Sequence, residues 1–189
     1  MEALLTSTGV VAVSEIGDKT QLLALILASR FRKPIPIILG IFVATLANHA
    51  AAAYAGEWVA TAVDPIILRW ALGSLFLVMA GWALNPDKID ESGHQVAYAS
   101  GAFIATTIAF FLAEMGDKTQ IATVGLAAHF GTLLPVMAGT TLGMMIADVP
   151  VVFIGDRAAN RINLKYVRYA AAAIFAALGI LVLTGVKLF

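Results

Sequence analysis

Two short segments of the chain combine acidic, basic, hydroxyl and amide side chains in one order, SEIGDKTQ at residues 14–21 and AEMGDKTQ at residues 113–120. Both segments lie inside long apolar runs. A charged side chain in the hydrocarbon core of a membrane costs at least about 2.5 kcal/mol and usually marks an ion pathway with partners close by. The chemistry open to such a set of carboxylates, hydroxyls and amides is the binding of a hard cation or the exchange of protons.

The composition indicates a membrane protein. Of 189 residues, 60% are hydrophobic and 13% are charged, and the mean hydropathy is +0.90. Twelve basic and twelve acidic residues cancel, so no nucleic-acid partner is expected. The chain has no cysteine, which excludes disulfides and thiolate metal sites. It also has no G-x-S-x-G or H-E-x-x-H motif, so we expect neither an enzyme nor a resident cofactor.

Six apolar runs are long enough to cross a bilayer, which takes about 20 residues. They are predicted at residues 3–29, 35–55, 66–84, 97–128, 133–154 and 166–186. The expected fold class is therefore all-α, a polytopic membrane protein with six transmembrane helices.

The second half of the chain repeats the first. A shift of 99 residues places Glu15 on Glu114, and the match continues without a gap into the following helices. Because each copy has three predicted spans, the second enters the membrane from the opposite side. Inverted repeats of this kind are typical of secondary transporters, whose substrate site lies near the midplane where the copies meet. We expect repeats at residues 1–84 and 97–189, joined by an acidic linker at residues 85–96.

The basic residues predict the orientation. Eight Lys and Arg residues lie on the side that holds the loops after the first, third and fifth predicted helices, and two lie on the other side. By the positive-inside rule, both termini lie outside the cytoplasm and the acidic linker lies inside it.

Helical spacing suggests how the charges meet. On a continuous helix Glu15, Asp18 and Lys19 project from one face, because residues three and four apart are neighbours. The second copy has the same spacing. If the two faces oppose each other, four carboxylates and two ammonium groups converge with a formal charge of −2. One divalent cation or two protons would neutralise this cluster, which predicts exchange of one divalent cation for about two protons.

The expected metal ligands are oxygen atoms. Such donors suit Ca²⁺, Mn²⁺ or Mg²⁺, whereas Zn²⁺ and Cu⁺ prefer nitrogen or sulfur, and Mg²⁺ gives up its water reluctantly. Thr20 and Thr119 would point away on an ideal helix and are candidates of second rank. Gly17 and Gly116 allow a close backbone approach or an unwound helix that offers carbonyls. The residues predicted to bind the metal are Glu15, Asp18, Gln21, Glu114, Asp117 and Gln120.

Lys19 and Lys118 each follow a glutamate by four residues, which is the spacing of a helical ion pair. One interpretation is that the pairs Glu15–Lys19 and Glu114–Lys118 merely hold helices together. Their duplication at mid-membrane depth favours a functional site instead. We therefore expect both lysines to tune the charge of the carboxylates rather than to bind substrate.

Polar residues in the second and fifth predicted helices are further candidates. His49 and Asp148 are equivalent under the repeat, and Asn48 precedes His49. Asp148 is expected to be a second ligand or a proton carrier, Asn48 is a weaker candidate near the metal, and His49 is expected to be an interhelical hydrogen-bond partner. Gly40 and Gly139 are expected at close contacts between helices.

The paired motifs EIGDKT and EMGDKT, in two three-helix repeats, resemble the E-x-G-D-(K/R)-(T/S) signature of a family of membrane cation/proton exchangers. This family includes Golgi calcium/manganese transporters similar to human transmembrane protein 165, and bacterial manganese exporters. The resemblance covers essentially the whole chain and implies export of Mn²⁺, or transport of Ca²⁺ and Mn²⁺, in exchange for protons. It implies metal binding by Glu15, Asp18, Glu114 and Asp117. The short chain is similar to the prokaryotic members, which implies the bacterial inner membrane and efflux from the cytoplasm.

The alternative is a cation channel or an exporter of small organic cations such as amino acids, because an acidic cluster can also hold an ammonium group. Against an amino-acid substrate, both lysines are expected to be committed to acids, so no spare cation would hold its carboxylate. A channel passes current down the ion gradient alone, whereas an exchanger couples metal flux to proton flux. The expected partners are a divalent metal ion, protons and the lipid bilayer. The unit is expected to be a monomer or a homodimer. One chain is expected to contain the complete site, since it carries both motifs.

Overall fold

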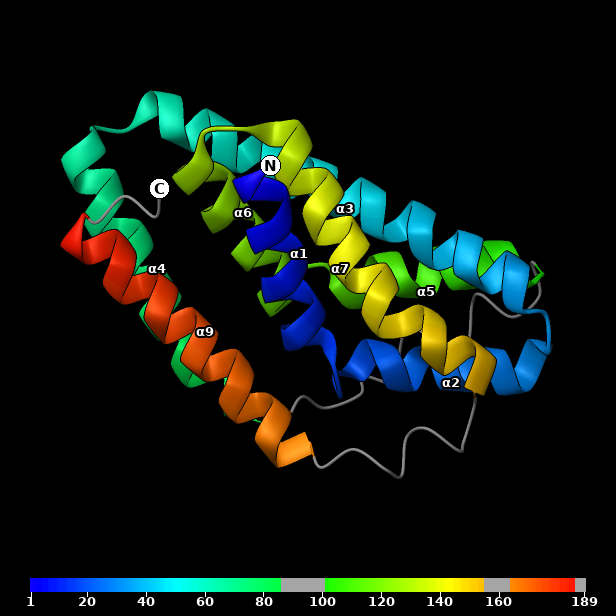
Figure 1. Cartoon of the computed structure of the whole chain (residues 1–189). Coiled ribbons are helices and arrows are strands. Elements are labelled where there is room, and N and C mark those ends of the chain that lie inside the picture. The colour runs from blue at the N-terminus through cyan, green and yellow to red at the C-terminus, as the bar shows by residue number, and fades with distance from the viewer. Residues whose placement is uncertain (86–100, 155–163, 186–189) are drawn as a thin grey trace.

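The computed structural model describes residues 1–85, 101–154 and 164–185, and every regular element in these ranges is a helix (Figure 1). The expected all-α class is confirmed. Residues 86–96 of the predicted linker lie outside the described part of the chain. The helices are α1 (Glu2–Glu15), α2 (Lys19–Phe31), α3 (Pro34–Ala62), α4 (Pro65–Ala83), α5 (Ala102–Glu114), α6 (Lys118–Phe130), α7 (Leu133–Ile154) and α9 (Leu164–Thr184).

The two predicted spans that contain the motifs are each broken into two helices. α1 ends at Glu15 and α2 begins at Lys19, while α5 ends at Glu114 and α6 begins at Lys118. The unbroken helices predicted over these stretches are therefore wrong. The break falls at the glycine of each motif, where the sequence allowed unwinding.

The element boundaries repeat with the sequence. α2 begins at Lys19 and α6 at Lys118, whereas α3 begins at Pro34 and α7 at Leu133. The first residues of α4 and α9 are related by the same 99-residue shift. Equivalent segments of the two copies thus fold into equivalent helices in the same order.

The two copies interlock through their long helices. α3 contacts α5 and α6 of the second copy, and α7 contacts α1 and α2 of the first. α3 and α7 also contact each other, and α4 and α9 form a pair along one side of the molecule (Figure 1). Each broken helix pair therefore lies against the long helix of the other copy, and this contact positions the motifs.

Glycines allow these close contacts. A Cβ atom built on Gly40 in α3 would lie 2.7 Å from the Cβ of Thr106 in α5, and one built on Gly139 in α7 would lie 3.0 Å from the Cβ of Ser7 in α1. Ser7 and Thr106 are themselves related by the 99-residue shift. The predicted close contacts at Gly40 and Gly139 are confirmed, and the same contact occurs in both copies.

Proline and a capping aspartate set the starts of the long helices. α3 begins at Pro34 and α4 at Pro65, where a missing N–H removes no intrahelical hydrogen bond. The side chain of Asp64 accepts hydrogen bonds from the N–H groups of Ile66 and Ile67. The chain therefore turns sharply between α3 and α4.

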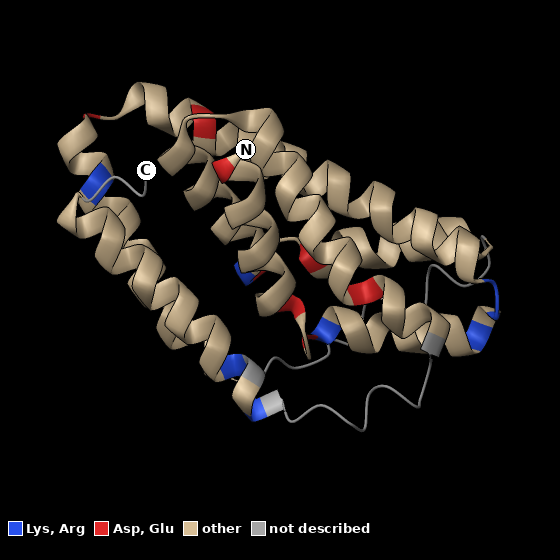
Figure 2. Cartoon of the chain, in the orientation of Figure 1, with Lys and Arg blue, Asp and Glu red and all other residues tan. Residues whose placement is uncertain are grey.

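The surface is that of a membrane protein. α3, α4 and the segment Leu133–Phe153 of α7 are long and apolar enough to cross a bilayer, and shorter apolar helices cover Ala102–Glu114 and Arg168–Thr184. Large apolar side chains are exposed on the outer faces, with Val78 67% and Ile180 55% exposed. Figure 2 shows α4 and α9 in tan, without acidic or basic residues, along most of their length, with acids and bases gathered where α1 meets α2. Buried charge with an apolar exterior is the arrangement that lipid requires.

Candidate metal centre

The E-x-G-D part of each motif forms a tight turn between two helices. Ile16 has φ −62° and ψ 118°, Gly17 has φ 79°, and the N–H of Asp18 donates to the carbonyl of Glu15 at 3.1 Å. These are the features of a type II turn, whose third residue has positive φ and is usually glycine. The turn at residues 114–117 has the same hydrogen bond at 3.1 Å and a glycine φ of 74°. The turn explains why each motif needs its glycine.

Each turn joins a helix that ends in Glu to a helix that begins after Asp. Glu15 and Glu114 are the last residues of α1 and α5, and Asp18 and Asp117 are the N-caps of α2 and α6. A carboxylate at an N-cap is stabilised by the positive end of the helix dipole. The four acids therefore gather at helix ends and not along one continuous helical face.

All four acids are buried. The exposed fraction is 0% for Glu15 and Glu114 and 3% for Asp18 and Asp117. One carboxylate oxygen from each of Glu15, Glu114 and Asp117 lies within 4.8 Å of the other two. Opposite ligands of a divalent cation lie about 4–5 Å apart, given metal–oxygen distances of about 2.0–2.6 Å. These three acids, drawn from both copies, are close enough to hold one cation.

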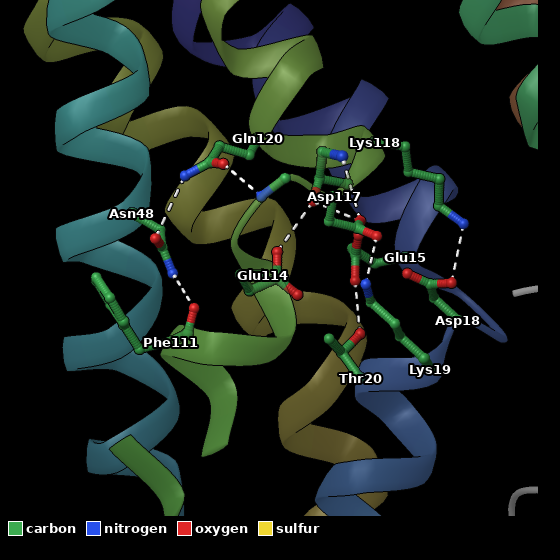
Figure 3. A network of polar contacts seen from close by, with 12 residues as sticks. Glu15, Asp18, Lys19, Thr20, Asn48, Phe111, Glu114, Asp117, Lys118 and Gln120 are labelled. Atoms are coloured by element: carbon green, nitrogen blue, oxygen red, sulfur yellow. Dashed lines mark hydrogen bonds and ion pairs between the residues drawn. The ribbon is translucent and has the colours of Figure 1, made fainter. Parts of the chain in front are cut away.

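Two ion pairs cross between the copies. Lys19 Nζ lies 2.7 Å from Asp117 Oδ1, and Lys118 Nζ lies 2.9 Å from Asp18 Oδ1 (Figure 3). From helical spacing, one interpretation paired each lysine with the glutamate four residues earlier. The structure pairs each with the aspartate of the other copy, because the turn interrupts the helix between the glutamate and the lysine.

The motif threonines point into the site. Thr20 Oγ1 donates to Glu15 Oε2 at 2.7 Å, and Thr119 Oγ1 donates to Glu114 Oε2 at 3.0 Å. Thr119 Oγ1 also lies 3.3 Å from Asp117 Oδ2. The prediction that these threonines point away is wrong, because the turn redirects the second helix so that its early residues face the end of the first.

The other oxygen of each glutamate has no partner among the described residues. Glu15 Oε1 and Glu114 Oε1 are buried and accept no hydrogen bond there, and neither do the two oxygens of Asp148. A buried polar atom without a partner costs about 1–3 kcal/mol, and a charged one costs more. These oxygens suit a cation or a proton. His49, predicted to be a hydrogen-bond partner between helices, is buried, and neither ring nitrogen has a partner in the described ranges.

The motif glutamines hold the turns. The N–H of Gly17 donates to Gln21 Oε1 at 2.8 Å, and the N–H of Gly116 donates to Gln120 Oε1 at 2.7 Å. Their amide nitrogens reach the long helix of the other copy. One acceptor, Ala147, was not predicted, because that contact uses a main-chain carbonyl. A ligand role for the glutamines stays a prediction.

A small cavity, with room for about one water molecule, lies beside the Asp18–Lys118 pair. Ser14 of α1 lines it, together with Ala83 at the end of α4 and Arg168 near the start of α9. The cavity therefore adjoins one of the crossed ion pairs from the side where α4 ends and α9 begins.

Comparison with known proteins agrees with this chemistry. Residues 3–91 and 102–187 match the family model described as "Divalent cation/proton antiporter GDT1". The "Putative manganese exporter" of Vibrio cholerae serotype O1 is 54% identical over 176 residues, which cover 93% of this chain and 87% of that protein. "GDT1-like protein sll0615" of Synechocystis is 28% identical over 87% of this chain and 88% of its own length. "GDT1-like protein 3" of Arabidopsis thaliana is 25% identical over 92% of this chain and 68% of its own length.

No solved structure matches the chain significantly. The family model covers both motif turns, which supply four of the five buried acids among the described residues, and the family is one of transporters rather than enzymes. The resemblance inferred from the paired motifs is therefore confirmed, and the chain belongs to the GDT1 family of divalent cation/proton antiporters.

Proposed function

We propose that this chain exports Mn²⁺ in exchange for protons, with Ca²⁺ as the next candidate substrate. The observation that carries the proposal is the approach of Glu15 and Glu114, one from each copy, each fully buried with one oxygen that has no partner among the described residues. Oxygen ligands favour Mn²⁺ or Ca²⁺ over Zn²⁺. The name of the Vibrio cholerae relative, a manganese exporter, favours Mn²⁺ over Ca²⁺.

The exchange follows from charge. The motif acids and lysines have a formal charge of −2, which one divalent cation or two protons would neutralise. The crossed ion pairs compensate both aspartates, so the two glutamates are the groups that lose protons when the metal binds. Asp148 is a proposed second ligand or proton carrier, and Asn48 a weaker candidate of the same kind. The proposed metal ligands are Glu15, Asp18, Glu114 and Asp117, with Gln21 and Gln120 as further oxygen donors.

The proposed topology has six transmembrane helices in two inverted repeats, residues 1–84 and 97–189. Each broken pair, α1 with α2 and α5 with α6, then forms one span. The repeated helix boundaries and the bias of basic residues support this arrangement. In a bacterial inner membrane, with both termini outside the cytoplasm, the inward proton gradient would drive efflux. One chain, as a monomer or within a homodimer, contains both halves of the site.

The cavity beside Asp18 is the proposed cytoplasmic approach to the metal. In the proposed topology the end of α4 and the start of α9 lie on the cytoplasmic side, and Ala83 and Arg168 line the cavity there. A cation arriving by this route first meets the Asp18–Lys118 pair.

Proton movement in proteoliposomes, driven by Mn²⁺ or by Ca²⁺, tests the proposal. The wild type is expected to move protons with either metal, with the lower half-saturation for Mn²⁺. Glu15→Gln and Glu114→Gln are each expected to be silent, because either substitution removes a proton carrier and a ligand. Glu2→Gln, at the start of α1, removes an exposed acid and is expected to behave as the wild type.

Two outcomes would count against the proposal. Metal current without proton movement would indicate the channel that sequence analysis left open. Proton movement driven by amino acids, and not by either metal, would indicate an exporter of organic cations.

A further inference from the structure

We infer that Gln21 and Gln120, proposed above as further oxygen donors, are also positioning residues, each of which clasps the turn of its own copy to the long helix of the other copy. The inference rests on the proposed function, since it explains how the metal ligands of the two copies are held together. In both copies the amide oxygen accepts the N–H of the turn glycine, and the amide nitrogen contacts the other copy.

The first clasp ends on a main-chain carbonyl. Gln21 Nε2 donates to the carbonyl of Ala147 in α7 at 2.8 Å. A helical carbonyl ordinarily accepts an N–H four residues later, within the helix. Pro150 lies inside α7, lacks the N–H that would bond to the carbonyl of Ile146, and disturbs the helix at that turn. The adjacent carbonyl of Ala147 is thereby accessible to the glutamine.

The second clasp ends on a side chain. Gln120 Nε2 lies 3.3 Å from Asn48 Oδ1 in α3, and Asn48 Nδ2 donates to the carbonyl of Phe111 at 3.0 Å (Figure 3). Phe111 lies in the last turn of α5, where carbonyls have no intrahelical donor. Asn48 thus ties the end of α5 and the start of α6 to one point on α3.

The two end points are equivalent under the repeat. Asn48 and Ala147 are 99 residues apart, and where α7 has Pro150, α3 has Ala51. One copy supplies an amide side chain on a helix without proline, and the other supplies a main-chain carbonyl beside a proline. In both copies the glutamine amide nitrogen bonds to the long helix of the other copy, although the acceptor differs. This indicates that the site requires the contact between turn and helix rather than a particular acceptor.

The clasps act on metal binding through geometry. Glu15 lies two residues before Gly17, whose N–H the first clasp holds, and the second copy has the same spacing. Without a clasp the turn keeps its internal hydrogen bond and the crossed ion pairs, and loses its tie to the long helix of the other copy. Ligands must be held within about 0.5 Å to bind well, so loss of a clasp should weaken metal binding while the fold persists.

A double-mutant cycle between Gln21→Met and Pro150→Ala tests the first clasp. Pro150 has no side-chain atom that could bind a metal, so any coupling between the two substitutions reports the contact of Gln21 with α7 and not a shared metal ligand. The dissociation constant for Mn²⁺ is measured by equilibrium titration of the purified full chain, together with its melting temperature. Gln21→Met is expected to weaken binding about tenfold and Pro150→Ala about fivefold, whereas Pro150→Ala in the Gln21→Met background should change it less than about twofold.

A matched control comes from the other copy. Gln120 ends on Asn48 and not on α7, so Gln120→Met and Pro150→Ala are expected to act additively. Additive effects in the Gln21 cycle, or equal coupling in both cycles, would overturn the inference. So would melting temperatures that fall while the dissociation constant stays unchanged, because that result assigns the glutamines to stability alone.

Two further measures keep the test decisive. Gln21→Leu also removes the amide and adds no charge, so it replaces Gln21→Met in the cycle if that variant does not fold. If the wild type binds neither Mn²⁺ nor Ca²⁺, the proposed function is wrong, but the clasp can still be tested. The coupling between Gln21 and Pro150 is then read from melting temperatures, where additivity would still overturn the clasp.

Discussion

Lys118 of the second copy forms an ion pair of 2.9 Å with Asp18, the N-cap of α2 in the first copy. The equivalent pair, Lys19 with Asp117, is 2.7 Å long. The two pairs differ in solvation, because the Lys118 side chain is 8% exposed and the Lys19 side chain 23%. Two reciprocal ion pairs thus join the two copies, and the Lys118–Asp18 pair is the less exposed to solvent.

Lys118→Met is expected to destabilise the protein more than Lys19→Met. Removing one partner from a buried ion pair leaves a buried charge and costs about 3–5 kcal/mol, whereas water partly compensates at the more exposed pair. Thermal unfolding in detergent measures the difference, with Lys33→Met, an exposed lysine, as the control. Adding Asp18→Asn to Lys118→Met should recover part of the loss, and equal losses at both lysines would contradict the expectation.

Gly116→Ala is expected to destabilise the chain by about 1–3 kcal/mol, because a side chain is strained at positive φ. Sterics elsewhere are not the cause, since a Cβ atom on Gly116 would meet nothing within 4 Å. Gly9 in α1 has equally open space and no positive φ, so Gly9→Ala is the control and should be neutral or stabilising. Melting temperatures compare the two, and equal effects would show that the turn does not require glycine.

Thr119→Val is expected to raise the half-saturation constant for the metal about tenfold, which corresponds to about 1.4 kcal/mol. The substitution keeps the shape of the side chain and removes the hydroxyl that donates to Glu114. Thr61 donates to the carbonyl of Trp58 at an exposed site, so Thr61→Val should leave transport unchanged. Metal-driven proton flux in proteoliposomes measures both constants. A similar loss of transport in Thr61→Val would mean that replacing any threonine by valine impairs the protein, and would contradict a specific role for the Thr119 hydroxyl.

Metal affinity is expected to fall steeply with acidity. If one cation displaces two protons, the apparent dissociation constant rises about 100-fold for each unit of pH lowered, once both sites are protonated. The residual binding of Glu15→Gln should depend on pH with half that logarithmic slope, because one proton carrier is gone. Titration with Mn²⁺ over a series of pH values gives the slope. A wild-type slope of one would mean exchange for a single proton.

The sequence by itself determined the class of protein and singled out the motif acids that the structure brings together. Glu15 and Glu114 stand in apolar runs where an unpartnered charge is costly, and the 99-residue repeat makes them a matched pair. Gly17 and Gly116 signalled possible unwinding, since glycine accepts the positive φ that a type II turn requires. These inferences needed only residue types and spacing.

Only the tertiary structure decided which groups meet. Each lysine had acids within reach in its own copy and in the other, so spacing could not choose between Glu15 and Asp117 as the partner of Lys19. The direction of Thr20 depended on the turn that precedes α2. The acceptor of Gln21 is a main-chain carbonyl, which every residue carries, so no side-chain type could identify Ala147. The physical reason is the same in each case: a four-residue turn redirects a helix, and the contacts that follow depend on where the other copy lies.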